Sequence, residues 1–222
     1  MRKHLVATTL ALPAAVTLLA GCGGLIGPEH TTKDSLRPTG TVRTIEIHSG
    51  SGTVRVTPGD KVVVRRTVRY NGDEAGTLKE PVDGTLTLDN CDRCSTDYTV
   101  TAPSGTVLRV QSGSGDVHIG EFTGSVRLEA GSGDIDAKSL GGTAELRTGS
   151  GSITAVFTGP VPDITANAGS GDVDLTLPRG SYLIDADSKS GSRNIDVPQQ
   201  GSDTHRVRIR TGSGDIKVRA AA

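Results

Sequence analysis

The sequence has very few aromatic residues and no excess of either charge. Aromatic residues make up 2% of the 222 residues, and Trp is absent. A core without large rings is thin, which favours narrow stacked sheets over a wide α/β core. The 24 Lys and Arg residues are balanced by 25 Asp and Glu residues. No basic run is interleaved with aromatic residues, so the composition argues against a nucleic-acid-binding protein.

The sequence also lacks the short motifs of common enzyme classes. Gly-x-Ser-x-Gly, His-Glu-x-x-His, Ser-x-x-Lys and the phosphate-binding P-loop are all absent. Carboxylates are numerous, so a glycosidase pair stays open, but there are few aromatic rings on which sugars could stack. We predict a protein without catalytic activity or cofactor. The alternative is a surface carbohydrate-active enzyme built on a β-helix.

The first 21 residues have the pattern of a lipoprotein signal peptide. The basic start "MRKH" precedes an apolar run at 5–20 that is too short for a confident membrane span. The run leads into Leu19-Ala20-Gly21-Cys22, which resembles the lipobox of bacterial lipoproteins. That resemblance implies cleavage before Cys22, acylation of its thiol and a location on the extracytoplasmic face of the cell membrane. An ordinary secretory signal with an incidental Cys is the alternative.

Residues 22–40 are expected to form a flexible linker, because they carry Gly, Pro and charges without periodicity. Two further cysteines, Cys91 and Cys94, form a Cys-x-x-Cys motif. Metal binding and redox chemistry stay open for this pair, but a structural disulfide is favoured outside the cytoplasm.

One phrase recurs along the chain, first as "SGSGDVHIG" and last as "TGSGDIKVR". The glycines that open the copies are Gly113, Gly131, Gly149, Gly169, Gly191 and Gly212. Their spacing of 18 to 22 residues is typical of a solenoid. An early copy, "HSGSGTVRVT", lies at 48–57.

Within each repeat, small apolar residues alternate with polar ones, as in half-buried strands. We therefore predict an all-β single-stranded β-solenoid of about 18–22 residues per coil, with an antiparallel β-sandwich as the alternative. Residues 41–110 would form N-terminal strands and a cap, and 111–219 the repeat solenoid. The alternating charged positions are predicted to make one binding face: Arg127, Asp136, Glu145, Arg147, Asp174, Arg208 and Lys217.

The Gly-Ser-Gly-Asp phrase is interpreted as a structural corner. Glycine would supply backbone angles that other residues avoid, and Ser and Asp would bond nearby N–H groups. A P-loop is excluded because no Lys-Ser/Thr or helix follows. A calcium-stabilised module is a further alternative, since Asp116, Asp134, Asp172 and Asp215 would stack as weak metal candidates. In "SGSRNID", Arg193 is read in the place of the second glycine.

The serial "SGSGDV/I" strands, preceded by "DYTVTAPSGTVLRV", resemble a bacterial β-strand-repeat domain of unknown function that carries the label putative adhesin. This putative-adhesin domain is akin to auto-transporter adhesin heads. The resemblance covers about 41–219 and implies an exported or membrane-associated β-helix without established catalysis. We therefore expect a lipid-anchored, adhesin-like binding or envelope-structural protein. Its expected partners are the membrane, through the N-terminal lipid, and a protein or polysaccharide of the envelope or cell surface.

Overall fold

The structure is a computed structural model that describes residues 29–71, 76–159, 163–198 and 205–221. The predicted signal peptide and the predicted lipidation site Cys22 lie outside these residues. The strands are β1 His30–Leu36, β2 Thr44–Ser49, β3 Val54–Pro58, β4 Val63–Tyr70, β5 Thr85–Leu88, β6 Cys94–Ala102, β7 Val107–Ser112, β8 Val117–Ile119, β9 Val126–Ala130, β10 Ile135–Leu140, β11 Ala144–Thr148, β12 Ile153–Phe157, β13 Asp163–Ser170, β14 Val173–Leu177, β15 Leu183–Ser190, β16 Arg193–Asp196, β17 Arg206–Ser213 and β18 Ile216–Ala220.

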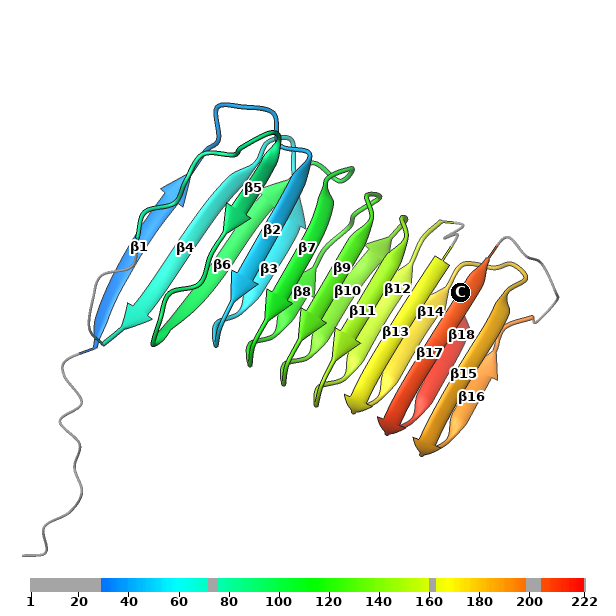
Figure 1. The fold of residues 1–222 in the computed structure, drawn as a ribbon. Helices are drawn as coiled ribbons and strands as arrows, with labels where there is room; N and C mark the ends of the chain where they lie inside the picture. The colour runs from blue at the N-terminus through cyan, green and yellow to red at the C-terminus, as the bar shows by residue number, and fades with distance from the viewer. Residues whose placement is uncertain (1–28, 72–75, 160–162, 199–204, 222) are drawn as a thin grey trace, which may run out of the picture.

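These strands form two sheets that face each other along a rod (Figure 1). Sheet A has the order β1-β4-β6-β3-β8-β10-β12-β14-β18-β16, and sheet B the order β15-β17-β13-β11-β9-β7-β2-β5. All pairings between these strands are parallel except those of β4 with β1 and β6. One strand of each sheet, joined by a corner, makes one coil. The predicted β-solenoid is confirmed, and the antiparallel-sandwich alternative is wrong.

The coils do not stack in chain order at either end of the rod. The spatial order is β5–β6, β2–β3, β7–β8, β9–β10, β11–β12, β13–β14, β17–β18 and β15–β16. The coil β17–β18 comes last in the sequence but lies between β13–β14 and β15–β16. β17 pairs with both β13 and β15, and β18 with both β14 and β16. The serial stack that the sequence suggests is wrong at this point.

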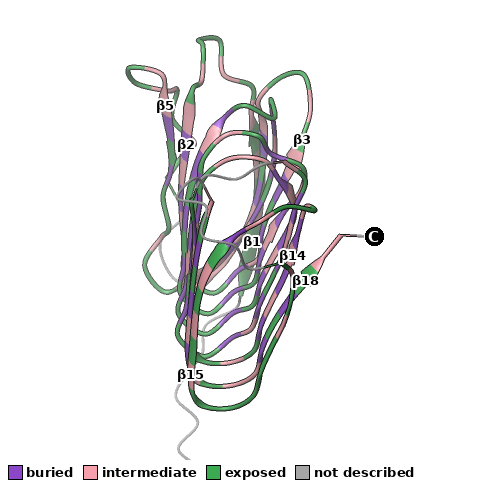
Figure 2. Cartoon of the chain, turned by 90° about the vertical axis from the view of Figure 1, so that its right-hand side faces the viewer, coloured by how far each residue is buried: buried purple, intermediate pink, exposed green. Residues whose placement is uncertain are grey.

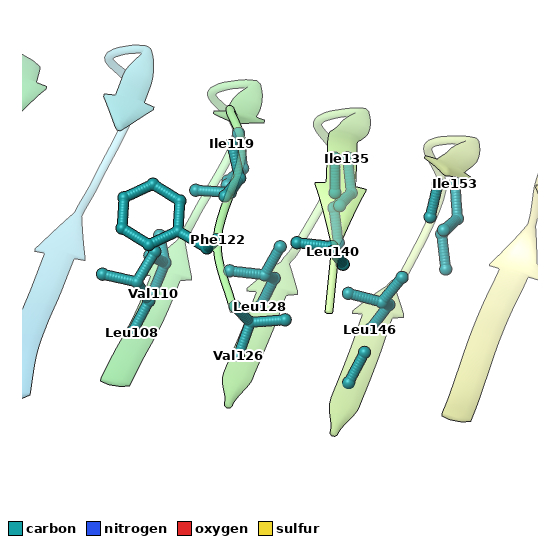
Figure 3. Packing of buried hydrophobic residues seen from close by; sticks show 14 of the residues in the cluster. Leu108, Val110, Ile119, Phe122, Val126, Leu128, Ile135, Leu140, Leu146 and Ile153 are labelled. Carbon is teal, nitrogen blue, oxygen red and sulfur yellow. The ribbon is translucent and has the colours of Figure 1, made fainter. Parts of the chain in front are cut away.

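The core is a thin layer of aliphatic side chains between the two sheets. Inward positions are buried and outward ones more exposed in the coils other than β15–β16, as the banding in Figure 2 shows. Figure 3 shows the rows of Val, Leu and Ile, with Phe122 as a rare ring among them. Phe122 and Phe157 are each no more than 1% exposed. The aliphatic alternation of the repeats is thus the source of the core.

β1 and β4 extend sheet A beyond the coils and help to close the N-terminal end of the core. The flexible-linker expectation fails for 30–36, because these residues pair antiparallel with β4 along its whole length. Arg66 points inward from β4 and is 7% exposed, and its Nε donates to Asp34 at 3.0 Å. Burial by itself would lower the Arg66 pKa, but the hydrogen bond and charge of Asp34 outweigh it and the pKa is raised.

The C-terminal end of the rod has no such cover among the described residues. In β15 and β16 no residue is fully buried, and the inward Ile184, Ala186 and Ile195 are only partly covered. Leu183 is 40% exposed. The coil β15–β16, which ends the rod, therefore presents the unpaired edges of its two strands.

Candidate functional site

The repeated corner is shaped by close stacking of one coil on the next. A Cβ placed on Gly133 would overlap the carbonyl oxygen of Gly115, and one on Gly131 would overlap that of Gly113. The same relation recurs at the other Gly-Ser-Gly corners that follow along the rod, up to Gly212 on Gly169 and Gly214 on Gly171. The expected need for unusual backbone angles is wrong for these corners except at Gly214, where φ is +155°. Glycine is required because neighbouring backbones approach too closely for a side chain.

A hydroxyl group just before the first glycine holds several corners. Ser112 Oγ donates to the Gly115 carbonyl at 2.7 Å within its own coil. Thr148 Oγ1 donates to Gly133 at 2.9 Å in the neighbouring coil, where the equivalent residue is Ala130. Each hydroxyl thus donates to a buried carbonyl group. Thr148 does so for the neighbouring coil, because Ala130 in that coil has no hydroxyl.

The aspartate column is a ladder of backbone caps. Asp116 Oδ1 accepts the N–H of Asp134 at 3.0 Å, and Asp134 Oδ1 accepts that of Ser152 at 2.7 Å. Further along, Asp172 Oδ1 accepts the N–H of Asp215 at 2.8 Å. Asp215 Oδ1 accepts the N–H of Ser192 at 2.8 Å. Each carboxylate ties its coil to the next coil.

The same ladder bears on the metal alternative. Within the described ranges, no group of three or more His, Cys, Asp or Glu side chains is placed to hold a metal ion. The hydrogen bond from Ser192 lowers the pKa of Asp215, because it favours the charged carboxylate. The column therefore has a structural role that needs no cation.

The reading of the last degenerate corner is wrong by two residues. Arg193 pairs with Ile216, so it occupies the first strand position and not that of a glycine. Gly191 stacks against Gly214 as the second glycine of its corner, and Ser192 takes the aspartate position. Because the first glycine is absent from this copy, the remaining glycine was aligned with the wrong position.

The predicted single binding face is split between the two walls of the rod. Four of its residues point outward from sheet B: Arg127, Glu145, Arg147 and Arg208. The other three point outward from sheet A: Asp136, Asp174 and Lys217. Alternation predicts which residues face out, but not which wall carries them.

On the outer wall of sheet B, opposite charges pair both along and across the strands β9 and β11. Arg127 lies 2.7 Å from Glu145 and 2.6 Å from Glu129. Arg147 lies 2.6 Å from Glu145 and 3.6 Å from Glu129. At the far end, a hydrogen bond from Arg210 holds the pKa of Asp185 below its usual value. These charges form a closed lattice of ion pairs, so the wall is electrically balanced there.

The outer wall of sheet A has a hollow of about 370 Å³ near the short strand β8. Its lining includes Arg55, His118, Gly120, Asp136 and Lys138. A bulge in β10 between Ala137 and Leu140 interrupts the ladder beside it. Asp136 lies 3.6 Å from Lys138 and 3.8 Å from His118, and it is the one carboxylate in the lining. The hollow is basic in character and holds no carboxylate pair.

The cysteine pair closes the corner between β5 and β6. Cys91 and Cys94 form a disulfide in the structure, with Cα atoms 5.7 Å apart. The corner "DNCDRC" contains no glycine, and Arg93 within it has φ of 53°. In the coil β5–β6, the disulfide takes the place that Gly-Ser-Gly has in the coils from β2–β3 to β13–β14 and in β17–β18.

Several residues of interest were not predicted. Arg66, which is buried, and Asp34, which is half-buried, form the ion pair of the N-terminal cap, and Lys33, Arg55 and Arg65 lie exposed on the wall of sheet A. The alternation of 54–58 and 63–70 was a usable signal for the outward arginines. No local pattern indicated that Asp34 would reach Arg66, because β1 lay in the expected linker.

The two facing, largely parallel sheets and their stacked coils define a β-solenoid. The family model named Toastrack DUF4097 matches residues 36–219, and the chain belongs to this family. Similar solved structures are a putative cell adhesion protein from Clostridium sporogenes and a putative adhesin from Bacteroides fragilis. The first has a TM-score of 0.45 at 14% identity and covers 87% of this chain and 100% of its own.

The second has a TM-score of 0.38 at 15% identity and covers 85% of this chain and 97% of its own. No curated protein matches the chain. The part of the chain that the structure describes includes no helix with the length and hydropathy of a membrane span.

Proposed function

We propose that this protein is a lipid-anchored, extracytoplasmic binding or envelope-structural protein of the adhesin-like kind, without catalytic activity. The observation that carries the proposal is the construction of the walls. Rows of outward side chains are fixed on stacked coils, and on sheet B they are held by mutual ion pairs. Such a surface is suited to contact with an extended partner and needs no chemical step.

The anchor is assigned to Cys22, on the lipobox Leu19-Ala20-Gly21-Cys22. Its test is mass spectrometry of the N-terminal peptide from membrane fractions. Diacylglyceryl-modified Cys22 at the N-terminus is the expected result, and an unmodified chain in the soluble fraction contradicts the anchor. The thiols give a second readout of export. Cys91 and Cys94 should resist alkylation in native protein until a reductant is added, and ready labelling would oppose an oxidising location.

The binding role is tested with isolated envelope. Retention of the wild-type chain is compared with that of two variants, one neutralised at Arg127, Glu145 and Arg147 and the other at Asp136, Asp174 and Lys217. The variant whose neutralised wall contacts the partner should be retained less than the wild type, whereas the variant of the other wall should be retained equally. Equal retention of both variants and wild type would oppose a binding role for either wall. Turnover of envelope glycans by the wild type would support the enzyme alternative.

A further inference from the structure

The two walls differ in charge near the N-terminal end of the rod. On sheet B, from β2 to β11, the outward side chains include three acidic and three basic residues: Glu46, Glu129, Glu145, Arg109, Arg127 and Arg147. All six take part in ion pairs. On sheet A, β1, β4, β6, β3 and β8 present four basic residues outward and one acidic: Lys33, Arg65, Arg69, Arg55 and Asp97.

Most of the basic charge on this part of sheet A is uncompensated. Arg69 is paired with Asp97 at 2.8 Å. Lys33, Arg55 and Arg65 form no ion pair with any of the residues described, and all three are exposed. The register places Arg65 and Arg55 on either side of Thr99 in one row.

Most residues between these cations carry hydroxyl groups. Ser35 lies opposite Arg65, and Thr67 lies between Lys33 and Asp97 in the next row. The surface therefore offers guanidinium and ammonium groups together with Ser and Thr hydroxyls on a firm sheet. Five strands at about 4.8 Å spacing make it roughly 19 Å wide. Such a patch matches a layer of phosphate groups better than a single small anion.

The length of chain before β1 limits where this patch can lie. β1 is the edge strand of sheet A, and His30 follows Cys22 by eight residues. Eight residues span at most about 28 Å when fully extended. A lipid on Cys22 would therefore keep Lys33 and its neighbours within reach of the headgroups. Resting on the proposed anchor, we propose that the patch of Lys33, Arg55 and Arg65 lies against an anionic phospholipid surface.

The test uses the chain from residue 22 with Cys22→Ser, so that lipid contributes nothing to binding. The probes are vesicles of phosphatidylglycerol mixed with phosphatidylcholine, and vesicles of phosphatidylcholine alone. Binding to the anionic vesicles that weakens with salt is expected, with none to the neutral ones. Each basic residue at an anionic surface contributes roughly a fivefold gain in affinity. The triple variant Lys33→Gln, Arg55→Gln, Arg65→Gln should therefore bind about 100-fold more weakly.

A matched control carries Arg179→Gln, Lys189→Gln and Arg206→Gln, away from the patch, where the same side-chain types are exposed. Thermal melts of both variants check that each is folded. The chain has no Trp, so Thr99→Trp and Thr165→Trp report which wall meets a headgroup quencher. Quenching at 99 and not at 165 is expected.

Equal losses in the two triple variants, or no binding to anionic vesicles, would overturn the assignment. Preferential binding of soluble polyglycerol phosphate over the vesicles would also overturn it, because the partner would then be a polymer. None of these outcomes bears on the lipid at Cys22, which is measured separately by mass spectrometry.

Discussion

At the scale of single residues, the corner glycines are fixed by the distance between coils. The prediction concerns Gly133→Ala. The new methyl group would overlap the Gly115 carbonyl, which is backbone and cannot rotate away. We expect a loss of roughly 2–4 kcal/mol in the free energy of unfolding. Urea denaturation monitored by circular dichroism measures it.

The control for this substitution is Gly105→Ala. Gly105 lies in an exposed turn, and nothing lies within 4 Å of the position of its added Cβ. Its stability should stay within about 0.5 kcal/mol of wild type. Equal effects at the two glycines would show that coil stacking does not dictate the corner.

Asp215 gives a prediction for acid. Its folded pKa lies below the ordinary value of 3.8, because the carboxylate accepts the Ser192 N–H. A carboxyl group with a lowered folded pKa adds stability that is fully present above the unfolded pKa. That stability is lost as the pH falls through the folded pKa. The contact between the last two coils should therefore weaken below about pH 4.

The measurement is an NMR titration of the Ser192 amide. In Asp215→Asn an acceptor remains but the charge does not, so the dependence of the Ser192 shift on acid should disappear. Titration of Asp215 at or above its ordinary pKa would contradict the assigned hydrogen bond.

At the scale of strands, the inserted coil sets the order in which the C-terminal end opens. β17 and β18 are paired on both sides, although they are last in the sequence, and β15 and β16 are paired on one side. Edge strands exchange their amide hydrogens faster than inner ones. We predict that peptides from 183–196 lose protection before peptides from 206–220 in hydrogen-exchange mass spectrometry. Earlier exchange of 206–220 would indicate a stack in chain order.

The strands of the coils could be predicted from the sequence, and their stacking order could not. Alternation around Val117 and Ile119, or Val173 and Leu175, specifies inward and outward positions directly. Every corner carries nearly the same residues, so no local signal indicates that Gly212 rather than Gly191 stacks on Gly169. The split of the charged residues between two walls was missed for the same reason, since strands from both walls share one alternating pattern.

At the scale of the whole molecule, the two ends differ in cover and the two walls differ in charge. The N-terminal end is covered by β1 and β4 and carries the uncompensated basic patch, whereas the coil β15–β16 at the C-terminal end has no fully buried residue. Sheet B has internally paired charges over its first half. If Cys22 carries the proposed lipid, this asymmetry would place the capped end near the membrane and leave the opposite end and sheet B for the proposed partner.

The aspartate ladder runs along much of the rod, so its relation to calcium is a property of the whole molecule. If the column held calcium, saturating the site at 100 times its dissociation constant would add about 2.7 kcal/mol to the stability. We predict the same melting midpoint with added calcium and with a chelator, because the Oδ1 atoms of Asp116, Asp134 and Asp172 each already accept an N–H of a neighbouring coil.

Differential scanning calorimetry of the mature chain measures both midpoints, and Asp134→Asn is the matched control. This variant keeps an acceptor for the Ser152 N–H but loses the negative charge that a cation requires. A midpoint that rises with calcium in the wild type and not in Asp134→Asn would place a cation in the column. A rise in both proteins would indicate calcium bound elsewhere. An unchanged midpoint in both proteins would mean that the aspartates link neighbouring corners through hydrogen bonds alone, without a cation.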